Sequence, residues 1–108
     1  MMRRGDIILC ALQGDYGKPR PAVVVQTDIV NETHDSVTLC PLTTHLIDVS
    51  LFRVSILPTK ANGLKVASQI MIDKITSQKR FKLREKIGEL TTDQLQKVNE
   101  ALRFWQAL

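Results

Sequence analysis

The sequence predicts a mainly β protein that ends in one helix, built as a small, strongly curved antiparallel sheet closing toward a barrel. Three observations predict this fold. Short apolar or alternating segments follow one another over residues 6–75, turn-forming residues separate them, and only the last segment has helical periodicity. No internal repeat or low-complexity tract interrupts the chain. A length of 108 residues then indicates one domain, assigned to residues 1–108.

Five segments have the pattern of strands. The predicted strands are residues 6–12, 22–26, 36–40, 51–57 and 66–75. The first is an apolar run typical of a strand buried on both faces, and the second is rich in β-branched residues. The third and fourth alternate polar and apolar side chains. Core candidates in the fifth are Val66, Ile70 and Ile72.

The last segment predicts a helix that begins after Thr91. Thr91 and Gln94 have the spacing of a capping box, in which each side chain binds the other residue's backbone N–H. Apolar residues then recur at steps of three and four, which makes one stripe along the helix. The stripe consists of Leu95, Val98, Leu102 and Trp105. We expect it, Trp105 included, to be covered by the sheet or by a partner subunit.

The composition is that of an ordinary globular protein. Apolar residues make up 44% and charged residues 24% of the chain, which excludes a disordered or collagen-like protein. No apolar run approaches the roughly 20 residues that span a bilayer. The basic N-terminus meets Asp6 before a short apolar stretch, unlike a secretory signal, so a cytoplasmic location is expected. Cys10 and Cys40 lack metal-ligand spacing and are predicted to be reduced core residues.

Positive charge is concentrated in the second half of the chain. Residues 1–54 have a formal charge of −1, whereas residues 55–108 have +5. A basic run lies between residues 74 and 86, with one acidic residue, Glu85, inside it. Its members are Lys74, Lys79, Arg80, Lys82, Arg84 and Lys86. Such a run fits a polyanion, an acidic protein partner or a solvated face.

Common catalytic and metal motifs are missing from the sequence. It has no nucleophile elbow, no Walker loop and no paired-cysteine or His-x-x-x-His motif, so no metal or cofactor is predicted. His34 and His45 are expected on the surface. What remains is a polar and cationic set at strand ends, where a rigid scaffold presents functional groups. This set consists of Lys18, Arg20, Thr43, Thr44, Ser68 and Gln69.

A series of short motifs runs along nearly the whole chain. They are Arg4-Gly5-Asp6-Ile7, Lys18-Pro19-Arg20-Pro21-Ala22-Val23-Val24, Asp28 with Asn31, Pro41-Leu42-Thr43, Ser68-Gln69 with Asp73, Ile87-Gly88-Glu89-Leu90 and Ala101-Leu102. In content and order these motifs resemble those of the MazF/PemK/Kid family of type II toxins. The resemblance implies a homodimeric SH3-like barrel of the CcdB/PemK plasmid-toxin type. It also implies a metal-independent endoribonuclease that cuts single-stranded mRNA and inhibits translation and growth. A cognate antitoxin with a flexible acidic segment is the implied inhibitor.

The same resemblance assigns the catalytic roles to Arg20 and Thr43. If the ribose 2′-OH attacks the adjacent phosphate, negative charge builds up on the non-bridging oxygens, to which a guanidinium and a hydroxyl can donate hydrogen bonds. From the residues alone, Arg20 could instead pair with Asp15 or Asp28, and Thr43 could be a turn or cap hydroxyl. Pro19 and Pro21 stiffen the backbone on both sides of Arg20.

Six further residues are candidates for RNA binding. They are Asp15, Tyr16, Lys18, Thr44, Ser68 and Gln69. The first loop is shorter than in many members of the family, and Ser68 stands where some members have an aspartate, so the proton acceptor is left open. Asp15 could take that role, and Tyr16 could stack on an unpaired base. Tyr16 could equally pack on the barrel, and Gln69 could only hold a loop.

Two other functions remain open at this stage. One is a non-catalytic poison of DNA gyrase, similar in fold to the CcdB toxins, which would depend on the C-terminal residues 105–108. The other is a barrel that binds RNA through the basic run without cutting it; its binding would be sensitive to salt while the RNA stays intact.

Overall fold

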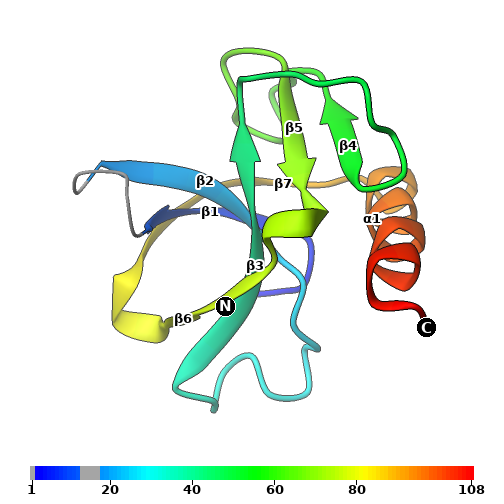
Figure 1. The fold of residues 1–108 in the computed structure, drawn as a ribbon. Coiled ribbons are helices and arrows are strands. Elements are labelled where there is room, and N and C mark those ends of the chain that lie inside the picture. The colour runs from blue at the N-terminus through cyan, green and yellow to red at the C-terminus, as the bar shows by residue number, and fades with distance from the viewer. Residues whose placement is uncertain (1, 13–17) are drawn as a thin grey trace.

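The computed structural model describes residues 2–12 and 18–108 (Figure 1). Within them, seven strands are followed by one α-helix. The strands are β1 (Asp6–Ala11), β2 (Pro19–Val24), β3 (Ser36–Thr43), β4 (Arg53–Ile56), β5 (Ser68–Met71), β6 (Thr76–Lys79) and β7 (Leu83–Glu89). Two single-turn 3₁₀ helices, η1 (Ile72–Lys74) and η2 (Arg80–Lys82), flank β6, and α1 spans Thr92–Gln106. The fold is therefore a mainly β antiparallel sheet with one C-terminal helix, as predicted.

β3 joins the two parts of the sheet. The strands follow the order β4-β5-β3-β2-β1-β7, and β6 also pairs with β3. Residues 36–39 of β3 pair with β6, whereas Leu42 and Thr43 pair with β5. Figure 1 shows β6 beside the lower part of β3 and β5 beside its upper part. Each end of β3 thus leads into a different loop, and the candidate site is at the upper end.

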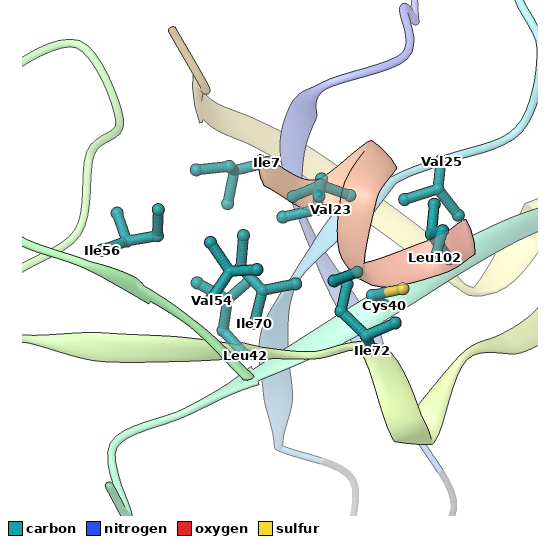
Figure 2. Packing of buried hydrophobic residues seen from close by; sticks show 12 residues of the cluster. Ile7, Val23, Val25, Cys40, Leu42, Val54, Ile56, Ile70, Ile72 and Leu102 are labelled. Carbon is teal, nitrogen blue, oxygen red and sulfur yellow. The ribbon is translucent and has the colours of Figure 1, made fainter. Parts of the chain in front are cut away.

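The main core lies between one face of the curved sheet and α1 (Figure 2). The helix contributes Val98, Ala101 and Leu102, all buried. The sheet contributes Ile7, Val23, Cys40, Leu42, Val54, Ile56 and Ile70, with Val25 just beyond β2 and Ile72 in η1. The residues that alternate with these point to the other face and form two smaller apolar clusters around Ile8 and Cys10. Both cysteines are buried free thiols, as expected, and burial raises the pKa of Cys40 to about 12.

The helix begins as the sequence predicts. Thr91 Oγ1 accepts from the Gln94 N–H at 3.1 Å, and Gln94 Oε1 accepts from the Thr91 N–H at 2.9 Å, which completes the capping box. Trp105 is only partly covered within this chain, and its cover by a partner subunit stays a prediction. Its ring lies in the last turn, packs on Phe52 with ring centroids 5.3 Å apart and stays 44% exposed. No helix in the described ranges is long and apolar enough to cross a membrane.

Several strand boundaries differ from the predictions; β3, for example, continues to Thr43. β2 begins at Pro19, earlier than expected, because proline tolerates the extended backbone and the Pro19-to-Pro21 segment pairs with β1. β5 ends at Met71, where η1 turns the chain, and Val66 lies in the preceding loop with 55% of its surface exposed. β6 and β7 were not predicted, since their charged, weakly alternating sequence hides their strand character.

Candidate functional site

The register of β2 and β3 places Arg20 and Thr43 on the same face of the sheet. Ala22 pairs with Pro41; Arg20 lies two residues before Ala22, and Thr43 lies two residues after Pro41. Because side chains alternate along strands and paired residues share a face, Arg20 and Thr43 both extend from the face opposite the main core. Figure 1 shows β2 and β3 crossing steeply. Both side chains are half-buried.

Thr43 is the last residue of β3 and starts a turn. Its Oγ1 accepts a hydrogen bond from the His45 N–H at 3.1 Å. A hydroxyl has one donor and two acceptor positions, so accepting this bond leaves its proton able to donate to a substrate oxygen. Thr44 follows with an exposed side chain. The alternative role of Thr43 as a turn hydroxyl is thus present in the structure and is compatible with a role in catalysis.

Further positive charge surrounds the strand end that carries Arg20. Arg20 is paired with Cys10 on β1, and Cys10 is paired with Leu83 on β7. Burial raises the pKa of the Cys10 thiol, and the nearby charges of Lys82 and Arg84 partly oppose this rise. η2 and β7 therefore each add one cation, Lys82 and Arg84, to the end of the sheet where Arg20 lies. Their membership of the basic run was the signal that could have placed them in the candidate site.

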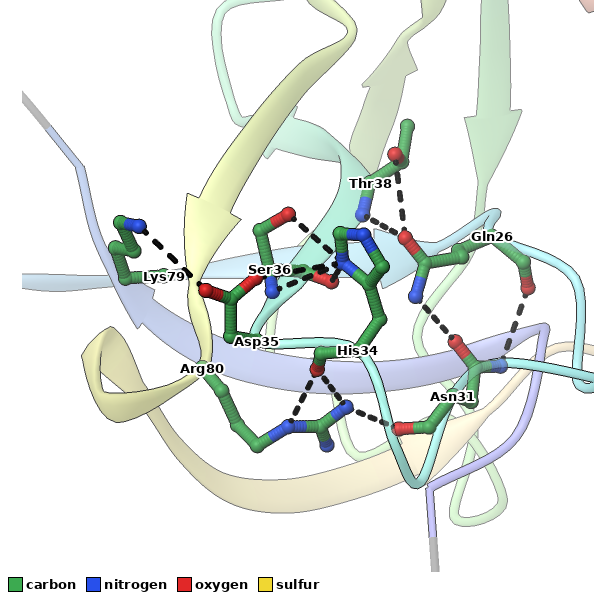
Figure 3. A network of polar contacts seen from close by, with 8 residues as sticks. All are labelled: Gln26, Asn31, His34, Asp35, Ser36, Thr38, Lys79 and Arg80. Carbon is green, nitrogen blue, oxygen red and sulfur yellow. Dashed lines mark hydrogen bonds and ion pairs between the residues drawn. The ribbon is translucent and has the colours of Figure 1, made fainter.

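Other members of the basic run hold the fold together. Arg80 donates through Nε to the His34 carbonyl at 3.0 Å and through Nη2 to the carbonyls of His34 and Asn31 (Figure 3). Lys86 lies 3.1 Å from the buried carboxylate of Asp6, and this contact raises the pKa of Lys86. The basic run is therefore divided between structural contacts and the end of the sheet near Arg20.

Ser68 and Gln69 are both buried on β5, and Gln69 contacts the loop that follows Thr43. Each side chain is 5% exposed. Ser68 Oγ donates to the Val66 carbonyl at 3.0 Å, and the Gln69 amide binds the backbone of Ile47. Gln69 also pairs directly opposite Thr43 in the β3–β5 ladder. The structure thus brings Gln69 next to Thr43 and engages both buried side chains in contacts within the protein.

Other predicted residues occupy different surroundings. Lys18 is exposed just before β2, whereas Asp15 and Tyr16 lie outside the described residues. His34 and His45 are exposed, as expected for surface histidines. In residues 2–12 and 18–108, no group of three or more His, Cys, Asp or Glu side chains is arranged to hold a metal ion.

Comparison with known proteins finds relatives along nearly the whole chain. The Probable endoribonuclease MazF of Mycolicibacterium smegmatis is 43% identical over 102 residues, which covers 94% of this chain and 93% of the relative. Endoribonuclease EndoA of Bacillus subtilis is 27% identical over 112 residues, covering 100% and 97%. Mycobacterium tuberculosis toxin MazF-mt6 has the same fold, with a TM-score of 0.83 at 24% identity over 95% of this chain and 97% of that one.

Another solved structure is an endoribonuclease in complex with its cognate antitoxin from a mycobacterial species. It matches with a TM-score of 0.81 and 21% identity, over 100% of this chain and 97% of that chain. The family described as PemK-like, MazF-like toxin of type II toxin-antitoxin system matches residues 3–105. This chain therefore belongs to the PemK-like, MazF-like toxins of type II toxin-antitoxin systems.

Proposed function

We propose that this toxin is an endoribonuclease that cuts single-stranded RNA without a metal ion and thereby stops translation and growth. The observation that supports the proposal is the register that puts Arg20 and Thr43 on one face of the sheet, each two residues beyond the Ala22–Pro41 pair. The 43% identical relative named as a probable endoribonuclease supports the same activity.

The proposed reaction needs donors more than it needs a strong nucleophile in the protein. The 2′ oxygen of the ribose forms a bond to phosphorus as its proton leaves, the bond from phosphorus to the 5′ oxygen breaks, and that oxygen takes up a proton. Negative charge develops on the non-bridging oxygens. The Arg20 guanidinium neutralises it with donors in a planar fork, and the Thr43 hydroxyl adds one more hydrogen bond.

The cations beside Arg20 favour a polyanionic substrate. Lys18 lies just before β2, Lys82 lies just before β7, and Arg84 lies in β7. Each of these cations can attract an RNA phosphate. Thr44, exposed beside Thr43, is a further candidate contact for RNA. Asp15 and Tyr16 keep their proposed roles at the RNA; in the sequence they lie between β1 and β2.

The toxin is proposed to act in the cytoplasm as a homodimer. Each subunit is proposed to be one toxin domain over residues 1–108. Its proposed inhibitor is a cognate antitoxin with a flexible acidic segment, which would cover the same cations. A solved relative bound to its cognate antitoxin supports this partner.

The activity is tested with the purified protein and a single-stranded RNA in the presence of EDTA. The expected products have a 2′,3′-cyclic phosphate on one fragment and a 5′-hydroxyl on the other. Arg20→Ala, folded by circular dichroism, should form them about 100- to 1000-fold more slowly. Loss of cleavage on adding EDTA would contradict the metal-free mechanism. Intact RNA after long incubation, with binding that weakens as salt rises, would favour a barrel that only binds RNA.

A further inference from the structure

Gln69 uses its side-chain amide to hold the backbone of a loop. Gln69 Oε1 accepts from the Ile47 N–H at 3.0 Å, and Gln69 Nε2 donates to the Ile47 carbonyl at 2.7 Å. One amide thus satisfies both backbone polar groups of a single loop residue, as a neighbouring strand would. Nε2 also lies 3.4 Å from Ser55 Oγ on β4. The side chain is 5% exposed, so these bonds are shielded from water.

The same residue also holds the other end of that turn. Thr43 is paired with Gln69 through the β3–β5 ladder, so the backbone of Gln69 fixes the first residue of the segment 43–47. The side chain of Gln69 fixes the last residue, Ile47. Between them, the His45 N–H donates to Thr43 Oγ1 at 3.1 Å. The segment is therefore a closed turn whose shape sets the direction of the Thr43 hydroxyl.

We propose that Gln69 is a positioning residue for RNA cleavage: by clamping Ile47 it holds the turn that aims the Thr43 hydroxyl at the scissile phosphate. This inference rests on the proposed function. It replaces the hypothesis that Gln69 contacts RNA, because the amide is buried and already bonded to Ile47. A misplaced donor weakens the transition state more than the bound substrate, so loss of the clamp should lower kcat and leave KM nearly unchanged.

The clamp requires a group that both accepts and donates, and this requirement provides a test. Gln69→Glu keeps the size of the side chain, but its ionised carboxylate only accepts and faces the Ile47 carbonyl oxygen. Burial and that oxygen raise the pKa of the new carboxyl group. When protonated, the carboxyl group can again donate to the carbonyl and accept from the N–H. Lowering the pH should therefore restore the clamp in Gln69→Glu but not in Gln69→Met, whose thioether cannot donate at any pH.

Gln26 offers a matched control at the other end of β3. Gln26 Nε2 donates to Asn31 Oδ1 at 3.1 Å, and Gln26 Oε1 accepts from the Thr38 N–H at 3.2 Å (Figure 3). This amide also holds a loop to β3, yet that loop lies at the end of the strand away from Thr43. Gln26→Glu makes the same chemical change and should lower the melting temperature without lowering kcat.

The experiment measures kcat and KM on a single-stranded RNA between pH 5 and pH 8, with the unaltered chain as reference at each pH. At pH 8 we expect kcat of Gln69→Glu and Gln69→Met to fall about 10- to 100-fold, the scale of a misplacement near 1 Å. The kcat of Gln69→Glu relative to the reference should rise as the pH falls, and that of Gln69→Met should stay low. In a Thr43→Val background, Gln69→Met should cause no further loss of kcat, because Gln69 acts through the Thr43 hydroxyl.

Different outcomes separate the two proposals. If the unaltered chain leaves RNA uncut, the proposed function is wrong and the inference is overturned with it. If the unaltered chain cuts RNA and Gln69→Met does so at an equal rate, the inference alone is overturned. An equal loss of kcat in Gln26→Glu, or a full further loss in the Thr43→Val background, would also overturn it, because either result indicates general destabilisation. Should Gln69→Glu fail to fold, Gln69→Met and its cycle with Thr43→Val still decide the matter.

Discussion

The two ends of β3 carry similar residues that make different use of their polar groups. At the end that starts with Ser36, the Gln26 amide holds the adjoining loop, and Arg80 donates to backbone carbonyls of that loop. At the other end, Gln69 holds a loop in the same way, but Thr43 keeps a hydroxyl proton to donate and Arg20 extends from the same face of the sheet. An amide that holds a loop is therefore structural at both ends. At the second end, the Thr43 hydroxyl and Arg20 also extend from the face opposite the main core.

The largest expected effect separates the two arginines. Arg20→Ala should lower the rate of RNA cleavage about 100- to 1000-fold, or roughly 3 to 4 kcal/mol in activation free energy, because it removes a preorganised donor to the transition state. Arg80→Ala should leave the rate nearly unchanged, since its donors bind the carbonyls of Asn31 and His34. Single-turnover cleavage and urea unfolding of both variants measure the contrast. Equal rate losses in the two variants would remove the distinction between the ends of β3.

A second contrast concerns acid stability and two aspartates. Asp73, beyond β5, accepts from Arg53 Nε at 2.7 Å and Nη2 at 3.0 Å, and this pairing lowers the pKa of Asp73 below its ordinary value of 3.8. Asp28, in the loop that Gln26 holds, also has a lowered pKa, through bonds from the Arg4 N–H and Asn31, but it is exposed.

A carboxyl group with a lowered folded-state pKa contributes stability above its unfolded pKa and loses it as the pH falls through the folded one. The Asp73 contribution should therefore be present at pH 7 and decline below about pH 4. Asp73→Asn should cost about 3 kcal/mol of unfolding free energy at pH 7, since it leaves the mostly buried Arg53 without its ionic partner. In Asp73→Asn the free energy of unfolding should also change less steeply with pH between pH 3 and pH 7. Urea unfolding from pH 3 to pH 7 tests this, with Asp28→Asn as the exposed control.

The sequence predicts the parts of this fold that depend on local patterns. The capping box at Thr91 and the apolar strand around Ile7 follow from the spacing of residue types, and both are confirmed. The prediction of Val66 as a core residue was wrong, because alternation alone does not show where a strand begins. The strand β5 begins only at Ser68. The strand β7 was not predicted, because its charged residues do not have the pattern of a strand. Its pairing with β1 defines it instead.

The candidate site could be named from the sequence, but its geometry could not. Family resemblance indicated Arg20 and Thr43, yet their common face depends on the register between β2 and β3, which a residue pattern does not specify. The burial of Gln69 could not be predicted either, because glutamine is usually a surface residue. Its burial here depends on a loop that is distant in the sequence. The contribution of β7 required the pairing of Leu83 with Cys10.

The smallest expected effect compares two threonines on β3. Thr43→Val keeps the β-branched shape and removes the hydroxyl, so cleavage should slow about 10- to 100-fold, the scale of one neutral hydrogen bond lost in a dry site. Thr38→Val is the control, because Thr38 Oγ1 only makes a long bond of 3.5 Å to Gln26 Oε1 and lies in the structural half of the strand. We expect its rate to match the unaltered chain. If Thr43→Val cuts RNA at full rate, Arg20 alone remains of the two proposed catalytic donors. The distinction between the ends of β3 would then depend on that one side chain.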